Sequence, residues 1–367
     1  MDGSIATAIG APPPVSFVAD VPLTAAQAES LAALRAVAAA ALARVHADDA
    51  YWRSDHALTR MLGARRFDVD KALAMLEEIV RWRNEVQAWR FLDPGFYKEP
   101  EVMRRYFPWG FAGVDRDGFP VLVERIGLTD LLGMHDAVGT DEFLRWVVFY
   151  HELQERMMRE ASAALGKDRH KMTVIVDMRG YNMRLASPAT LGVLHKRTRL
   201  EEDHFPEVVK RIFLINTPAI FASAWTIVAY FMDEGTRNKV QLLGGDYFST
   251  VSQYVEEKHL PSFLGGALAD CRGDAECRSI MAPGGLVPLA FLAGVAADGL
   301  GAGEEATVAA GKASELTLRV PAGCELAWHW GTAEKDLTFT VTATRCSGAT
   351  AAVPAGVLDV GFATASV

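Results

Sequence analysis

The sequence predicts an α/β fold in which a mixed, largely parallel sheet is flanked by helices. Short apolar runs typical of strands alternate with longer stretches of helical periodicity through the middle of the chain. This alternation favours parallel strand pairs. Residues 172–177 form an apolar run suited to a strand buried on both faces. Further strands are expected at residues 121–123, 212–215 and 240–243.

Most of the expected helices begin at a residue whose side chain can cap backbone N–H groups. Thr24 and Gln27 have the spacing of a capping box, which opens an alanine-rich helix toward residue 43. Ser187 is followed by Pro188, which fits the first position of a helix because an N–H there has no intrahelical partner. Other helices are expected after Ser54 and Asp68, from Thr140 to about residue 164, and over residues 246–257.

Residues 212–232 contain no charged or histidine side chain and are long enough to cross a bilayer as one helix. Thr217 and Pro218 argue against a membrane span, because this pair ends a strand and begins a new helix from residue 219 to about residue 231. Two interpretations stay open: an ordinary core helix, or a lid over an apolar cavity that touches a membrane when it opens. The apolar stripe of this helix is Phe221, Trp225, Val228 and Met232.

The formal net charge of −9 argues against nucleic acid as a partner, because binding to a phosphate backbone requires clustered lysine and arginine. It also argues against standing attraction to anionic lipid, which leaves transient membrane contact. The four cysteines form no CxxC pair, so zinc is not expected. A Cys271–Cys277 disulfide would require an oxidising compartment, but the first residues do not resemble a signal peptide. A cytoplasmic location is therefore expected.

The chain contains no nucleophile elbow, P-loop, dinucleotide fingerprint or HExxH motif. We therefore predict no enzyme activity, no catalytic residues, no metal and no cofactor. The cluster at residues 201–204 contains metal-ligating residue types, but we interpret it as a solvated helix end. Arg65 falls on the apolar stripe of the helix after Ser54, and Lys239 begins a predicted strand. Both cations need partners, because an unpaired buried charge is costly. The simplest interpretation is a pair of structural salt bridges.

Several segments resemble the CRAL-TRIO lipid-transfer family, which includes fungal phosphatidylinositol/phosphatidylcholine transfer proteins and animal tocopherol- and squalene-binding relatives. Residues 65–69 (Arg-Arg-Phe-Asp-Val) and 81–83 (Arg-Trp-Arg) are similar to its helical leader. Residues 115–121 (Asp-Arg-Asp-Gly-Phe-Pro-Val) are similar to its D-x-D-G-x-P-V turn. The other likenesses lie at residues 176–180, 205–207, 215–218 and 260–266, in family order.

The resemblance implies an α/β domain that encloses a lipid-sized pocket, with the helix after Pro218 as its gate. In the phosphatidylinositol-binding members the headgroup is held by residues that correspond here to Arg65, Glu207, Thr236 and Lys239. Two cations, one carboxylate and one lipid phosphodiester sum to zero charge. A closed, desolvated site requires such a balance.

The resemblance also implies a second-ligand pocket formed by Phe111, Leu122, Tyr150, Met172 and Val174. Phosphatidylcholine-binding members surround choline with tyrosines and hydroxyl side chains, and of these five positions Tyr150 alone matches. A more hydrophobic second ligand, such as tocopherol or a sterol precursor, is therefore expected.

The C-terminal part resembles a GOLD domain at residues 283–288 and 320–330, and strands are expected at residues 315–320, 325–330 and 337–342. The expected organisation is a loose leader (1–23), a helical N-terminal region (24–100), a CRAL-TRIO lipid-binding domain (101–266) and a GOLD-like β region (267–367) that is expected to be incomplete.

The expected function is that of a soluble protein that takes up phosphatidylinositol in a gated pocket and exchanges it at membranes, with Golgi or endosomal contact. The alternative is a lipid sensor or adaptor that presents bound lipid to a kinase, a GTPase regulator or a trafficking partner, with a protein partner bound through the C-terminal region.

Overall fold

The structure is a computed structural model that describes residues 22–181, 187–218, 221–230, 232, 234–288 and 291. It also describes short strands at residues 325–329, 338–339, 342–344, 350–352, 356–357 and 362–366. Most of the predicted leader, the predicted strand at residues 315–320, and residues 320–324 and 330 of the GOLD-like motifs lie outside the described residues.

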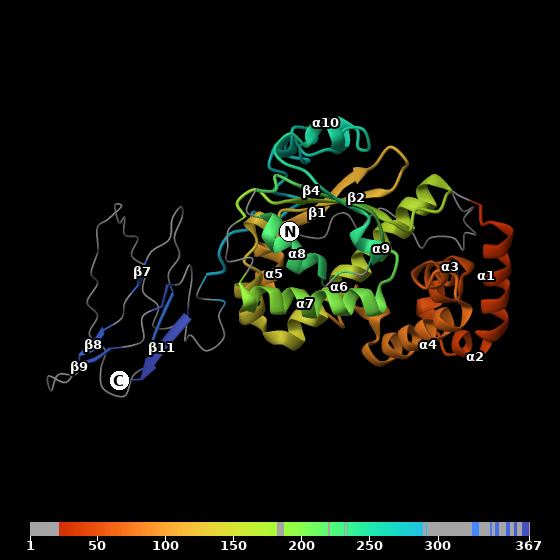
Figure 1. Cartoon of the computed structure of the whole chain (residues 1–367), viewed down its shortest axis with the longest axis horizontal. Helices are drawn as coiled ribbons and strands as arrows, with labels where there is room; N and C mark the ends of the chain where they lie inside the picture. Colours follow the sequence, from red (N-terminus) through yellow and green to blue (C-terminus); the bar gives the residue numbers. More distant parts are fainter. Residues whose placement is uncertain are drawn as a thin grey trace.

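A five-stranded sheet with strand order β1-β2-β3-β4-β5 forms the centre of the fold (Figure 1). β1 is antiparallel to β2, whereas the other neighbouring pairs are parallel. This confirms the predicted mixed, largely parallel sheet. The strands are β1 (Trp109–Val114), β2 (Pro120–Glu124), β3 (Met172–Asp177), β4 (Val209–Ile215) and β5 (Val240–Leu242).

The two faces of the sheet bury different cores, because successive side chains of a strand point to opposite faces. On one face, side chains such as Leu122, Val174 and Leu214 join a core with the long helix α6 (Leu131–Leu165). On the other face, alternate residues such as Val123 and Ile175 pack with the segment that follows β5. Figure 1 shows α6 on one side of the sheet and α10 on the other.

The helices supply both coverings of the sheet and a separate N-terminal bundle. The α-helices are α1 (Ala25–Val37), α2 (Ala39–Ala43), α3 (Asp55–Ala64), α4 (Val69–Val86), α5 (Glu101–Tyr106), α6, α7 (Pro188–His204), α8 (Phe221–Tyr230), α9 (Glu234–Arg237) and α10 (Phe248–Val251). The 3-10 helices are η1 (Ala47–Arg53), η2 (Ala88–Arg90), η3 (Ile126–Leu128), η5 (Glu257–His259) and η6 (Ser262–Leu264). Helices α1 to α4 and η1 enclose their own apolar core.

The predicted helix caps at Thr24, Ser54, Asp68 and Ser187 are confirmed, whereas the N-cap of α6 is Asp130 and not Thr140. Thr24 Oγ1 accepts a hydrogen bond from Gln27 N at 3.3 Å, and Gln27 Oε1 accepts one from Thr24 N at 3.0 Å. The side chains of Ser54, Asp68 and Ser187 likewise accept hydrogen bonds from the first turns of α3, α4 and α7. These signals are local, so the sequence is sufficient to locate them.

Three predicted helices have different bounds in the structure. The first is interrupted at Ala38, and the helix predicted from Thr140 begins at Leu131, with a break in helical geometry at Gly139. The Thr217 hydroxyl donates to the Leu243 carbonyl at 2.8 Å, which ties the end of β4 to the end of β5. The helix predicted over residues 246–257 is wrong, since α10 ends at Val251. There the carbonyls of Ser252 and Tyr254 accept hydrogen bonds from Arg116 instead.

The C-terminal strands are β6 (Glu325–His329), β7 (Thr338–Phe339), β8 (Thr342–Thr344), β9 (Thr350–Ala352), β10 (Gly356–Val357) and β11 (Phe362–Ser366). They form three antiparallel pairs, β6 with β11, β7 with β10 and β8 with β9. The GOLD-like assignment stays a prediction. Within the described residues, each helix is too short or too polar to cross a bilayer. Cys271 and Cys277 are free thiols.

Candidate functional site

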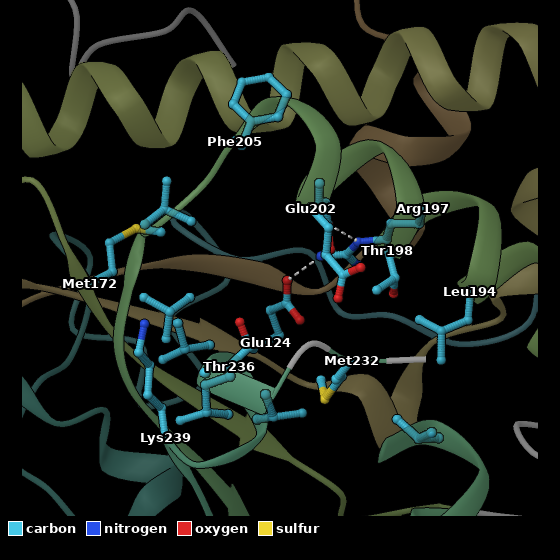
Figure 2. Close-up of a pocket in the computed structure, with 18 of the residues that line it drawn as sticks. Glu124, Met172, Leu194, Arg197, Thr198, Glu202, Phe205, Met232, Thr236 and Lys239 are labelled. Carbon is cyan, nitrogen blue, oxygen red and sulfur yellow. Dashed lines mark hydrogen bonds and ion pairs between the residues drawn. The ribbon is translucent and has the colours of Figure 1, made fainter. Parts of the chain in front are cut away.

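A cavity of about 940 Å³ lies between the α6-facing side of the sheet and the helices α7 and α8. Apolar side chains of β2, β3 and β4 line much of its wall, among them Leu122, Val174 and Leu214. Charged side chains gather in two separate places on the same wall (Figure 2). Lys239 and Thr236 lie on one side of the cavity, whereas Arg197 and Thr198 lie on the other.

The first group, here named the outer charged cluster, consists of Arg65, Lys171, Glu207 and Lys239. Glu207 Oε2 accepts hydrogen bonds from Lys171 Nζ at 2.6 Å and from Lys239 Nζ at 3.3 Å. Burial opposes ionisation of Glu207, but the two lysines outweigh it and lower the pKa of its carboxyl below the ordinary value. Glu207 and Lys239 line the cavity, whereas Lys171 contacts Glu207 from outside it.

Arg65 lines the cavity at the C-terminal cap of α3. Its Nη1 donates to the Ala64 carbonyl at 3.2 Å, and its side chain forms no ion pair with any residue that the structure describes. The prediction that Arg65 belongs to the apolar stripe of α3 is wrong, because the helix ends at Ala64 and the backbone of Arg65 leaves helical geometry. The buried arginine of this helix is Arg60, whose exposed fraction is 4%.

Arg60 holds the backbone beside Glu207. Its guanidinium donates to the Pro206 carbonyl at 2.9 Å and to both carboxylate oxygens of Glu155. Glu207 itself has a φ of +57°, in the left-handed region that side chains rarely adopt. The anchored Pro206 carbonyl therefore fixes a conformation that aims the Glu207 carboxylate at the two lysines.

The second group, here named the buried charge cluster, consists of Glu124, Tyr150, His151, Arg197 and Glu201. Arg197 Nη2 donates to Glu124 Oε1 at 3.1 Å (Figure 2). Arg197 Nε donates to Glu201 Oε1 at 2.6 Å. The Tyr150 hydroxyl also donates to Glu124, and His151 Nε2 lies 2.9 Å from Glu201 Oε1. All five residues line the cavity.

The charges in this cluster depend on one another. Burial opposes ionisation of Glu201, but the charge of Arg197 and the hydrogen bond from His151 lower the pKa of Glu201 to about 2. Burial also opposes the charge of Arg197, and Glu201 and Glu124 outweigh it, so the pKa of its guanidinium lies well above the ordinary value. The interpretation of residues 201–204 as a solvated helix end is therefore wrong for Glu201.

The predicted gate residues Phe221, Trp225, Val228 and Met232 all line the cavity. Phe221 has an exposed fraction of 4% and packs edge-on against Tyr181, with ring centroids 5.3 Å apart. At the other end of α8, Tyr230 is 83% exposed. The helix therefore has one face on the cavity and a terminal aromatic residue in solvent.

Comparison with known proteins places this arrangement in a family. Residues 104–266 match the family model described as the CRAL/TRIO domain. This part of the chain is a CRAL/TRIO domain. Its fold is similar to that of the crystal structure of Sfh5, with a TM-score of 0.51 at 16% sequence identity over 64% of this chain and 85% of that one.

Relatives of this chain occur among longer proteins. "Protein real-time" of Anopheles gambiae is 36% identical over 220 residues, which cover 58% of this chain and 32% of that protein. The phosphatidylinositol/phosphatidylcholine transfer protein SFH12 of Arabidopsis thaliana is 31% identical over 223 residues, which cover 60% of this chain and 41% of that protein. This chain thus spans well under half the length of these relatives.

Most of the residues predicted for a second ligand line the cavity of the CRAL/TRIO domain. Leu122, Met172 and Val174 project from β2 and β3, and Tyr150 projects from α6. Phe111 is not among the lining residues. It packs edge-on against Trp109, whose ring in turn packs against Tyr150 at 4.5 Å between centroids.

A third polar group joins the leader to the CRAL/TRIO domain. His56 Nδ1 lies 3.0 Å from one carboxylate oxygen of Asp168, and His170 Nδ1 lies 2.9 Å from the other. These are metal-ligating residue types at close spacing. The two histidines already bond to the carboxylate, and none of the three residues lines the cavity, so we interpret the group as a hydrogen-bonded bridge between α3 and the loop before β3.

Proposed function

We propose that this protein binds phosphatidylinositol in the cavity and exchanges it at membranes. The observation that carries the proposal is the combination of an apolar cavity of about 940 Å³ with the outer charged cluster on its wall. An acyl chain and a phosphate headgroup need these two environments side by side. The name of the Arabidopsis thaliana relative, which includes both phosphatidylinositol and phosphatidylcholine, supports a phospholipid as the ligand.

The charge of the outer cluster supports an anionic headgroup. Arg65, Lys171 and Lys239 are cations and Glu207 is the carboxylate among them, which leaves a formal excess of two positive charges before a ligand binds. The balance expected from sequence omitted Lys171, so one excess positive charge, and not zero, remains when a phosphodiester is bound. Lys171 and Lys239 both hydrogen-bond to Glu207. Arg65 and Lys239 are the cations of the cluster that line the cavity and meet the phosphodiester, while Glu207 and Thr236 accept hydrogen bonds from inositol hydroxyls.

The acyl chains supply most of the binding energy in this proposal. Burial of apolar area contributes about 25 cal/mol per Å², so two acyl chains outweigh the few polar contacts of the headgroup. Release then requires α8 to move, because Phe221, Trp225, Val228 and Met232 lie against the same space. Tyr230, exposed at the end of α8, provides an aromatic contact for a membrane interface.

Transfer of labelled phosphatidylinositol between vesicles, together with mass spectrometry of copurified lipid, tests the proposal. We expect Lys239→Ala and Arg65→Ala to lower phosphatidylinositol transfer at least about tenfold, since each removes a charge-assisted hydrogen bond to phosphate. Lys258→Ala is the matched control, because Lys258 is exposed and pairs with Glu256 away from the cavity. Equal transfer by all variants would refute the headgroup assignment.

A further inference from the structure

The buried charge cluster contains the parts of a site for an organic cation. The Tyr150 ring is fully buried beside the Glu124 carboxylate, and the Trp109 ring packs against it at 4.5 Å between centroids. Quaternary ammonium groups are recognised in proteins by aromatic faces, aided by negative charge. Such a site on the wall of a lipid cavity would suit a choline headgroup.

Arg197 already occupies this place. Its guanidinium carbon lies 5.2 Å from the centre of the Tyr150 ring and 5.6 Å from that of Phe107. Its nitrogens bind Glu124 and Glu201 at 3.1 Å and 2.6 Å. Figure 2 shows Arg197 reaching Glu124 from α7, on the side of the cavity away from Lys239. The aromatic face and both carboxylates are thus engaged by a cation of the chain itself.

We propose that Arg197 is a specificity-determining residue that excludes lipids with a quaternary ammonium headgroup, such as phosphatidylcholine, from this cavity. The inference rests on the proposed function in that it takes the cavity to be a lipid site. Arg197 lies on a different part of the cavity wall from the outer charged cluster. Experiments can therefore test this inference and the proposed function separately.

The exclusion follows from occupancy of the site. The guanidinium is tethered to α7 and held by two carboxylates, so a diffusing cation cannot exchange with it without leaving Glu124 and Glu201 to be paired anew. Two carboxylates oppose one guanidinium in this cluster, so repulsion by net charge does not cause the exclusion. The Tyr150 face and both carboxylates are already engaged, and a trimethylammonium group would gain neither contact.

The wild-type protein gives the first test. Donor vesicles carry labelled phosphatidylinositol and labelled phosphatidylcholine, and transfer of each to acceptor vesicles is measured. We expect phosphatidylcholine to move at least about tenfold more slowly than phosphatidylinositol, and comparable rates would overturn the inference. Transfer of phosphatidylcholine alone would overturn both ideas. Absence of phosphatidylinositol transfer would count against the proposed function, while the variants below still report on Arg197.

A designed gain of binding gives the second test. The double variant Arg197→Met, Glu201→Gln removes one cation together with one carboxylate and leaves Glu124 beside Tyr150. We expect its phosphatidylcholine transfer to rise at least about tenfold, while phosphatidylinositol transfer stays within about twofold of wild type. Adding Glu124→Gln to the double variant should abolish the rise in phosphatidylcholine transfer. The single variant Arg197→Lys keeps a cation at this position, so its phosphatidylcholine transfer should not rise.

A folded double variant that gains no phosphatidylcholine transfer would overturn the inference. Circular dichroism and thermal unfolding establish whether the variant is folded. If it is not, the ratio of the two lipids in the wild-type protein decides the question alone.

Discussion

Arg60 and Glu155 form a buried ion pair in which Nη2 and Nη1 of the guanidinium lie 2.6 Å and 3.1 Å from the two carboxylate oxygens. The same guanidinium donates to the Pro206 carbonyl and to the Tyr51 hydroxyl at 2.9 Å each. One side chain therefore links α3, η1, α6 and the backbone before Glu207. The helical leader and the outer charged cluster depend on the same contact.

Arg60→Ala should lower the free energy of unfolding by about 3–5 kcal/mol, because it leaves the buried Glu155 carboxylate without its partner. Arg81→Ala, which removes an exposed ion pair with Glu78 on α4, should cost less than about 1 kcal/mol. Urea denaturation followed by circular dichroism measures both. A small effect of Arg60→Ala, equal to that of the control, would mean that the leader does not depend on this pair.

Stability should fall as the pH falls from about 4.5 toward about 2. Burial opposes ionisation of Glu155, but the charge of Arg60 and its hydrogen bonds outweigh this and lower the pKa of Glu155 to about 2. Glu201 behaves in the same way beside Arg197. A carboxyl whose pKa is lowered in the folded state stabilises the fold at any pH above its unfolded-state pKa. This contribution is lost as the pH falls toward its folded-state pKa.

Thermal unfolding between pH 2.5 and pH 6 checks this dependence. The variant Glu155→Gln removes one of the two titrating groups, so its melting temperature should change less over this interval than that of the wild-type protein. An unchanged slope in the variant would contradict the assignment.

Lys171→Met should weaken phosphatidylinositol binding about fivefold, or roughly 1 kcal/mol. The physical reason is competition within the outer charged cluster. Without Lys171, which lies 2.6 Å from Glu207, the carboxylate draws Lys239 toward itself and away from a lipid phosphate. Vesicle-binding titrations measure the effect, and Lys167→Met, at an exposed position outside the cluster, is the control. Tighter binding by Lys171→Met would rule out this role.

The ion pair between Arg66 and Glu234, at 2.5 Å, joins the turn after α3 to α9, immediately beyond the gate helix. Both side chains are largely exposed, so Glu234→Gln should change the free energy of unfolding by less than about 1 kcal/mol. It should nevertheless speed lipid release, since one link across the cavity rim is lost. Stopped-flow release of a fluorescent lipid measures this, with Glu85→Gln on α4 as the control. Identical release rates would show that this pair does not restrain the gate.

Local signals predicted much of the fold. The strand at residues 172–177 and the caps at Thr24, Ser54 and Ser187 depend on neighbours within four positions. The charge networks depend on partners far along the chain. Arg60 and Glu155 are 95 positions apart, and Arg197 and Glu124 are 73 apart. No periodicity reveals such pairs.

Arg65 illustrates the same limit at short range. Its place on the apolar stripe follows from extending α3 by one residue, and the helix ends one residue earlier. Family resemblance nevertheless identified four positions, Arg65, Glu207, Thr236 and Lys239, that the fold brings to one cavity. It did not identify Arg197 or Glu201, because the segments that resemble the family do not include them.

The sheet divides its strands between two compartments, since even-numbered residues of β2 and β3 such as Leu122 and Val174 face the cavity while odd-numbered ones such as Val123 and Ile175 face the opposite layer. Single substitutions at the cavity-facing positions can therefore change ligand preference. The residues that face the opposite layer, and that layer itself, stay unchanged. A sheet of this kind allows related proteins with the same fold to bind chemically different ligands.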